Sequence, residues 1–232
     1  MSIFEQIVSP ENLFCAWREF RRGKRAKPDV QRFERHLEDN LFALAEDLAS
    51  ARYRHGPYKK FHIFDPKHRI IHKATVRDRV VHHAVSRVVA PLCEQSFIFD
   101  SYSCRIGKGT HAAVRRIETF ARSVSGNFTG PCWALKCDIR KYFDSISHDV
   151  LLRLLGRRVS DPQTLELLRR TIESYPPVDN NGERERANWR PDRQSHIATF
   201  CERLSRFLRP FRERTAGREA LSPLHRRFHP AA

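Results

Sequence analysis

Apolar side chains at three- and four-residue steps limit most strongly how this chain can fold, because they mark helices that bury one side. Residues 29–51 show the pattern most completely and predict one amphipathic helix, with charged residues on its opposite side. Its apolar positions are Val30, Phe33, Leu37, Leu41, Leu44 and Leu48. Four further helices are expected, and their starts are marked by Val76, Thr110, Ser147 and Asp161.

Two segments have the patterns of β-strands. Aromatic and branched residues flank the turn Asp65-Pro66-Lys67-His68, where Pro66 suits the second turn position, and they predict a hairpin with a cationic tip. Residues 133–139 alternate between apolar and polar side chains, which predicts a strand with two different faces. Several helices with a few short strands indicate an α+β fold.

Charge points to a polyanionic partner. The 232 residues include 43 Lys and Arg against 27 Asp and Glu, so the formal net charge is +16. The chain has no run of 18 apolar residues and no basic, apolar start typical of a signal peptide, so a cytoplasmic protein is expected. Its six cysteines are far apart in sequence, which argues against a zinc or disulfide framework and predicts buried thiols.

Several other motifs carry weaker signals. His82 and His83 are neighbours in a predicted helix and cannot share one face, so we interpret them as solvated or core-edge imidazoles rather than metal ligands. Pro91 should disturb the end of that helix. The string Gly107-Lys108-Gly109-Thr110 lacks the spacing of a phosphate loop, although Lys108 could still contact a nucleic-acid phosphate.

Asp138 stands where the predicted strand 133–139 ends, before a basic and aromatic turn. Such a carboxylate can hold a divalent cation against phosphates, but one carboxylate does not make a metal site. A carboxylate that caps the turn is the alternative.

The segment DIRKYFDSI, preceded by WALKC, resembles the first catalytic motif of bacterial reverse transcriptases. The resemblance extends upstream through YKKFHIFDPKHRIIHKATVRDRVVHHA and FDSYSCRIGKGTHAA and covers about residues 29–175. It is closest to the enzymes of diversity-generating retroelements, retrons and group II introns. It implies a right-hand polymerase with fingers, palm and thumb. In this chain we expect an N-terminal extension (1–28), a fingers-like region (29–131), the start of a palm with the first catalytic motif (132–176) and an out-of-frame tail (177–232) in place of the thumb.

The resemblance also implies roles for single residues. Asp138 would bind catalytic Mg²⁺ together with the backbone carbonyl of Ile139, and Phe143 would be the steric gate that favours deoxynucleotides. Lys67 and Arg69 would grip the triphosphate of the deoxynucleoside triphosphate. The partners would be an RNA template and a DNA primer. Independently of the resemblance, basic residues are expected to contact nucleic-acid phosphates, namely Lys59, Lys60, Lys73, Arg77, Arg79 and Lys108.

Two further motifs of that family, a P-x-G-x-x-x-S-Q loop and a Y-x-D-D turn, do not occur in the chain. Reading the possible codons of Pro191 to Arg206 one base forward permits PIGNLTSQLFANVYL, and the same shift at Leu224 to His229 permits YIDDF. This predicts a change of reading frame between about Tyr175 and Pro191. All nine lysines lie at or before Lys141, while ten arginines lie at 190–227, as displaced codons would produce.

Three functions follow from these patterns. The first is an RNA-directed DNA polymerase whose chain, as printed, has one of three metal-binding aspartates and no activity of its own. The second is a non-catalytic protein that binds RNA or DNA through its basic residues. The third is a partly folded product without a function.

Overall fold

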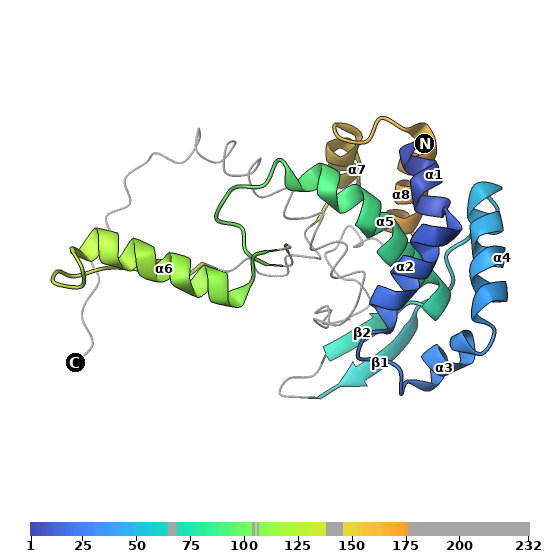
Figure 1. The fold of residues 1–232 in the computed structure, drawn as a ribbon, viewed down its shortest axis with the longest axis horizontal. Coiled ribbons are helices and arrows are strands. Elements are labelled where there is room, and N and C mark those ends of the chain that lie inside the picture. The colour runs from blue at the N-terminus through green and yellow to red at the C-terminus, as the bar shows by residue number, and fades with distance from the viewer. Residues whose placement is uncertain (65–68, 104, 106, 138–145, 176–232) are drawn as a thin grey trace, which may run out of the picture.

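The computed structural model describes residues 1–64, 69–103, 105, 107–137 and 146–175. Within them it has helices and a two-stranded antiparallel sheet, in agreement with the predicted α+β class (Figure 1). The elements in chain order are α1 (Ile3–Val8), α2 (Pro10–Arg21), α3 (Pro28–Glu34), α4 (Leu37–Ala49), β1 (Lys59–Ile63), β2 (Arg69–Lys73), α5 (Val76–Glu94), α6 (Thr110–Ser125), α7 (His148–Gly156) and α8 (Pro162–Glu173).

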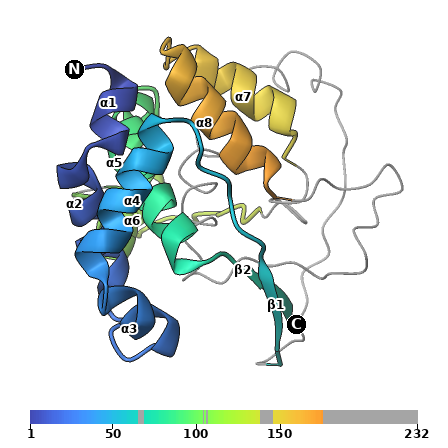
Figure 2. The same ribbon diagram turned by 90° about the vertical axis from the view of Figure 1, so that its right-hand side faces the viewer.

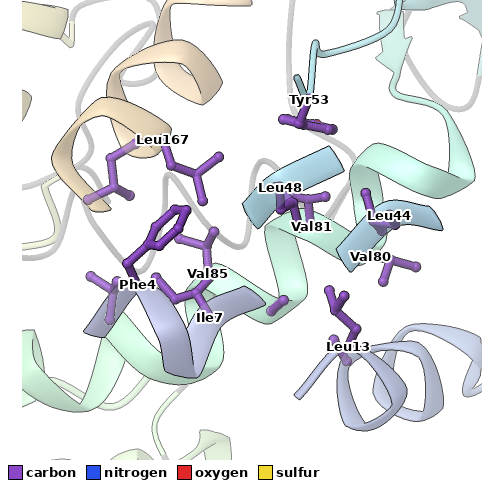
Figure 3. Close-up of a cluster of buried hydrophobic side chains, with 14 of the residues drawn as sticks. Phe4, Ile7, Leu13, Leu44, Leu48, Tyr53, Val80, Val81, Val85 and Leu167 are labelled. Carbon is purple, nitrogen blue, oxygen red and sulfur yellow. The ribbon is translucent and has the colours of Figure 1, made fainter. Parts of the chain in front are cut away.

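The hydrophobic core is built around α5. Helices α1, α2 and α3 contact α5, α4 covers α2, and α7 and α8 pack together beside α1 (Figure 2). Figure 3 shows how side chains of α1, α2, α4, α5 and α8 meet there, with Val81 and Val85 of α5 beside Leu48, Ile7 and Leu167. Residues 1–28, expected as an extension, therefore contribute two helices to the core.

The single helix predicted over residues 29–51 is wrong, because the structure has two helices there. Helix α3 ends at Glu34, and His36 is the N-cap of α4. The Asn40 side-chain amide donates a hydrogen bond of 3.0 Å to the Phe33 carbonyl and thereby satisfies a group that the break exposes. The predicted apolar positions still face the core, with Val30, Leu41, Leu44 and Leu48 buried and Phe33 and Leu37 packed at its edge.

The starts of the later helices follow the sequence closely. Ser147 and Asp161 are the N-caps of α7 and α8, as predicted. Thr110 is the first residue of α6 instead of its cap, and Gly109 takes the cap position with φ +149°, a conformation that favours glycine. Helix α5 runs through Pro91 and ends three residues later at Glu94.

The predicted hairpin is confirmed in its strands, and its turn lies outside the described residues. Lys59 pairs with Lys73 and Phe61 with Ile71 across the two strands. The strand predicted over 133–139 is wrong for residues 133–137, which have exposed side chains and no strand pairing. In the described part of the chain, no helix combines the length and apolar character needed to span a membrane.

Candidate nucleic-acid interface

The hairpin lies at the edge of the molecule (Figure 1), and two lysines of its first strand are exposed. Lys59 and Lys60 are consecutive exposed residues of β1, and Lys59 lies directly opposite Lys73 of β2. Like charges in directly opposed positions of a sheet repel each other. A bound phosphate would relieve this repulsion, so the arrangement favours a polyanion.

Asp29 at the start of α3 offsets part of this charge. Its carboxylate lies 2.7 Å from Lys73 Nζ and 2.6 Å from Arg79 Nη2. Burial by itself would raise the pKa of Asp29, but the hydrogen bonds from Lys73 and Arg79 outweigh burial and hold that pKa below its ordinary value. The sequence carried no sign of this role, because Asp29 is separated from both cations by more than forty residues.

Arg77 and Arg79 are turned toward the protein. Arg77 is ion-paired with Asp47 at 2.6 Å, and its guanidinium lies 5.0 Å from the centre of the Tyr53 ring. Arg79 is buried, donates to the Thr75 carbonyl, and lies 4.8 Å from the Phe20 ring centre. A phosphate could reach Arg79 only by displacing internal partners. Contact of Arg77 and Arg79 with nucleic acid stays a prediction.

Lys108 lies away from the hairpin, in the segment that leads to α6. Its Nζ is 4.0 Å from the ring centre of Phe99 and 5.0 Å from that of Tyr102. Such cation–π contacts fix the ammonium over the rings while leaving the residue only half-buried. A contact between Lys108 and a phosphate also stays a prediction.

Exposed aromatic rings on the hairpin were not identified from the sequence. Phe64, just beyond β1, is strongly exposed, and its ring stacks on that of His62 with their centres 6.3 Å apart. Phe61 is partly exposed on the other face of the strand. Aromatic rings beside lysines provide stacking surfaces for unpaired bases. The alternation of Lys60, His62 and Phe64 was the available signal, since alternate residues of a strand share one face.

A buried polar cluster holds the base of the hairpin to α5. The Asp78 carboxylate accepts hydrogen bonds from Tyr53 Oη at 2.8 Å, from Thr75 Oγ1 at 2.5 Å and from the Gly56 amide at 3.2 Å. All three donors come from the chain around the hairpin or just before α5. The cluster therefore fixes the direction in which the strands leave the core.

Imidazoles and a phenol extend this cluster toward α8. His55 Nε2 lies 3.2 Å from His82 Nε2, and Tyr58 Oη lies 3.1 Å from Ser174 Oγ at the end of α8. His82 is buried, so its assignment to solvent or the core edge is wrong: its ring packs into the core beside His55. His83 is half-buried with Nδ1 3.8 Å from Glu19, as expected of a core-edge residue.

The predicted catalytic residues are not placed by the structure. Lys67, Asp138, Ile139 and Phe143 lie outside the described residues, and of Arg69 the structure describes only the backbone, in β2. Among the residues that are described, no three His, Cys, Asp or Glu side chains are grouped so that they could hold a metal ion. The metal and nucleotide sites therefore stay predictions.

Cysteine burial was predicted correctly only in part. Cys93 is buried, and burial raises the pKa of its thiol to about 11. Cys15 is half-buried. Cys132 and Cys137 are exposed, contrary to the prediction, because the segment that carries them does not join a sheet.

No model of a known protein family matches the chain. Individual proteins do. Protein YkfC of Escherichia coli K12 is 29% identical over 136 residues, which are 58% of this chain and 35% of that protein. Nuclear intron maturase 1, mitochondrial, of Arabidopsis thaliana is 29% identical over 97 residues, 42% of this chain and 13% of the maturase.

The group II intron-encoded protein LtrA of Lactococcus lactis is 22% identical over 140 residues, 59% of this chain and 22% of its own length. This chain thus spans about a third or less of these relatives. These relatives, at modest identity, support the resemblance of the chain to the reverse transcriptase family.

Proposed function

We propose that the chain is the fingers region and partial palm of an RNA-directed DNA polymerase, and that its described part binds RNA through the β1–β2 hairpin. The observation that carries the binding proposal is the pair of consecutive exposed lysines on β1, one of them facing Lys73 across the sheet. Exposed Phe64 supports it, because a ring beside lysines can stack with a base. The intron maturase and intron-encoded relatives support RNA as the partner.

Catalysis belongs to the same proposal but to residues outside those described. Asp138 would hold Mg²⁺ with the carbonyl of Ile139, Phe143 would select deoxynucleotides, and Lys67 and Arg69 would meet the triphosphate. Nucleotidyl transfer through paired metal ions needs more carboxylates than Asp138 alone supplies. We therefore expect the 232-residue chain to bind RNA and to synthesise no DNA. A further part of the proposal is that the gene encodes the missing motifs one base forward.

RNA binding is tested by fluorescence anisotropy with a labelled single-stranded RNA at several salt concentrations. Lys59→Ala combined with Lys60→Ala should weaken binding and lower the steepness of its salt dependence by roughly 1.4, since each phosphate contact on a single strand contributes about 0.7. Arg115→Ala combined with Arg153→Ala is the matched control, because it removes two charges at exposed positions away from the hairpin. Equal losses in both double variants would reject the hairpin as the binding surface.

Asp138→Ala separates binding from catalysis. It should leave RNA affinity nearly unchanged in the 232-residue chain, because the lysines of the hairpin remain. Primer extension with Mg²⁺ by the unaltered chain would contradict the expectation that it lacks activity.

A further inference from the structure

Helix α6 extends away from the core and leaves an apolar face exposed (Figure 1). Val114, Ile117, Phe120 and Val124 have 46–71% of their surface accessible. At 100° per residue these side chains, with Ala121, lie on one side of the helix, and Arg115, Thr119 and Ser123 lie on the other. An amphipathic helix gains stability chiefly by burying such a face, so this one is suited to a partner.

The spacing of the apolar face specifies a kind of partner. Val114, Ile117, Ala121 and Val124 follow steps of three, four and three residues, the repeat of a seam between two helices. Consider two copies of α6 packed antiparallel through this face, with the two-fold axis crossing the helices at the level of residue 119. Val114 then meets Val124 of the second copy, and Ile117 meets Ala121 of the second copy. Each large side chain thus faces an apolar residue, and the face is complementary to itself.

The charges beside the apolar face are paired within the chain. Arg116 binds Asp100 with Nε 2.8 Å from the carboxylate, and its guanidinium covers the Phe120 ring at 4.4 Å. Arg122 binds Glu118 at 2.7 Å, one helical turn earlier. Because both arginines already have acidic partners, this border suits a second copy of the same neutral face better than an acidic protein or a nucleic acid.

The chain just beyond α6 carries further exposed apolar residues. The helix is about 24 Å long at 1.5 Å per residue, which is short for a pair of helices that associate unaided. Phe128, Trp133 and Leu135 follow it and are exposed, the last two almost completely. They are additional exposed apolar area in the segment that follows the helix.

We propose that the apolar face of α6 is a self-association surface on which a second copy of this chain docks antiparallel. The surface is separate from the hairpin and does not depend on the polymerase assignment. Two copies each carrying a net charge of +16 repel each other as whole molecules. Salt screens that repulsion, so the association should strengthen as salt is raised, opposite to the behaviour of contacts with nucleic acid.

The test measures the mass of nuclease-treated protein by light scattering and sedimentation at 0.1 and 0.5 M NaCl. The unaltered chain should reach twice its 27.3 kDa mass, more completely at the higher salt. Ile117→Glu places a charge at the centre of the seam and should weaken association at least tenfold. Ser123→Glu adds the same charge on the opposite side of α6 and should leave association intact. Far-UV circular dichroism should show both variants folded.

Three results would overturn the proposal. One is a monomer at about 100 μM protein in both salt conditions. Another is a dimer that Ile117→Glu does not weaken. A dimer that dissociates on nuclease treatment or on added salt counts equally against the proposal, because nucleic acid would then be bridging the two copies. The third is a monomeric protein in which Ile117→Glu lowers the melting temperature by the same amount at every protein concentration. The apolar face would then be covered within a single chain.

Discussion

Arg79 is a positive charge inside the core that depends on three internal partners. The Asp29 carboxylate neutralises it, the Thr75 carbonyl accepts one of its N–H groups, and the Phe20 ring lies against its guanidinium. Removing it would leave Asp29 with Lys73 alone and open a gap against Phe20. Because of this position, we expect Arg79 to contribute to the stability of the fold rather than to the binding of nucleic acid, although it comes from a basic stretch.

Arg79→Ala should therefore lower the free energy of unfolding by about 2–3 kcal/mol, less than for a fully buried pair because Asp29 is partly exposed. Urea denaturation followed by circular dichroism measures this change. Lys59→Ala is the comparison, and it should alter stability by no more than about 0.5 kcal/mol, as exposed positions usually do. Similar costs for both variants would mean that the internal ion pair contributes little.

His82 makes stability depend on pH. Burial, and next the neighbouring charge of His55, hold the pKa of His82 well below its ordinary value of 6.5. The unfolded chain therefore binds a proton more readily than the folded protein, and the contribution of His82 is complete above about pH 6.5 and is lost as pH falls below it. The melting temperature should fall between pH 7.5 and 5.5. In His82→Gln, which cannot be protonated, that fall should be shallower.

His83→Gln provides the control for this pH dependence. His83 is one residue away but lies at the core edge beside Glu19. Its replacement should leave the slope of melting temperature against pH close to that of the unaltered protein. A His82→Gln slope as steep as the original would assign the effect to other imidazoles.

At the scale of elements, Asp161 joins two ends of the described chain. One carboxylate oxygen accepts the Phe4 amide at 2.7 Å and the Thr164 hydroxyl at 2.8 Å, while the other accepts the Gln163 amide at 3.1 Å. Asp161→Ala removes both the cap of α8 and a link to α1, so we expect a loss of about 1–2 kcal/mol. Ser147→Ala removes a cap that serves α7 alone and should cost less in the same urea denaturation. An equal loss would show that the link to α1 adds nothing.

The sequence predicted an element well where the residues that form it are neighbours in the sequence. The caps of α7 and α8 and the strands of the hairpin are specified by residues a few positions apart. The break between α3 and α4 has no glycine or proline to mark it, because packing against α2 and α5 places it. The alternation over 133–137 fits a strand but finds no neighbouring strand among the described residues.

In the candidate interface, too, the features set by nearby residues were predicted and those set by distant residues were not. Its lysines were recognised from composition and order, and Lys59 and Lys60 are exposed as a phosphate contact requires. The inward direction of Arg77 and Arg79 could not be predicted, since their acidic partners Asp47 and Asp29 are distant in sequence. Ionic networks of this kind exist only once the helices have packed.

For the whole molecule, the excess charge of +16 divides unevenly. Residues 1–187 contain 33 basic and 23 acidic residues, while residues 188–232 contain 10 and 4. The second group has arginine as its sole basic type apart from histidine, and it holds the positions where a forward shift of one base permits the two absent motifs. Charge that arises from displaced codons would not have been selected for binding, so the hairpin and its surroundings should account for the affinity for RNA.

The coding DNA tests this directly, because each displaced codon fixes a third base. YIDDF requires Arg226 to be encoded by CGA or AGA, Arg227 by CGA, His225 by CAT and Phe228 by TTT. The string PIGNLTSQ requires Pro191 as CCC, Asp192 as GAT and Gln194 as CAA. Any other arginine codon at 226 or 227 would remove an aspartate from the shifted reading and refute the hypothesis. If the codons agree, a gene corrected between codons 175 and 191 should yield a protein that extends a DNA primer on RNA, and Asp138→Ala should abolish that synthesis while RNA binding persists.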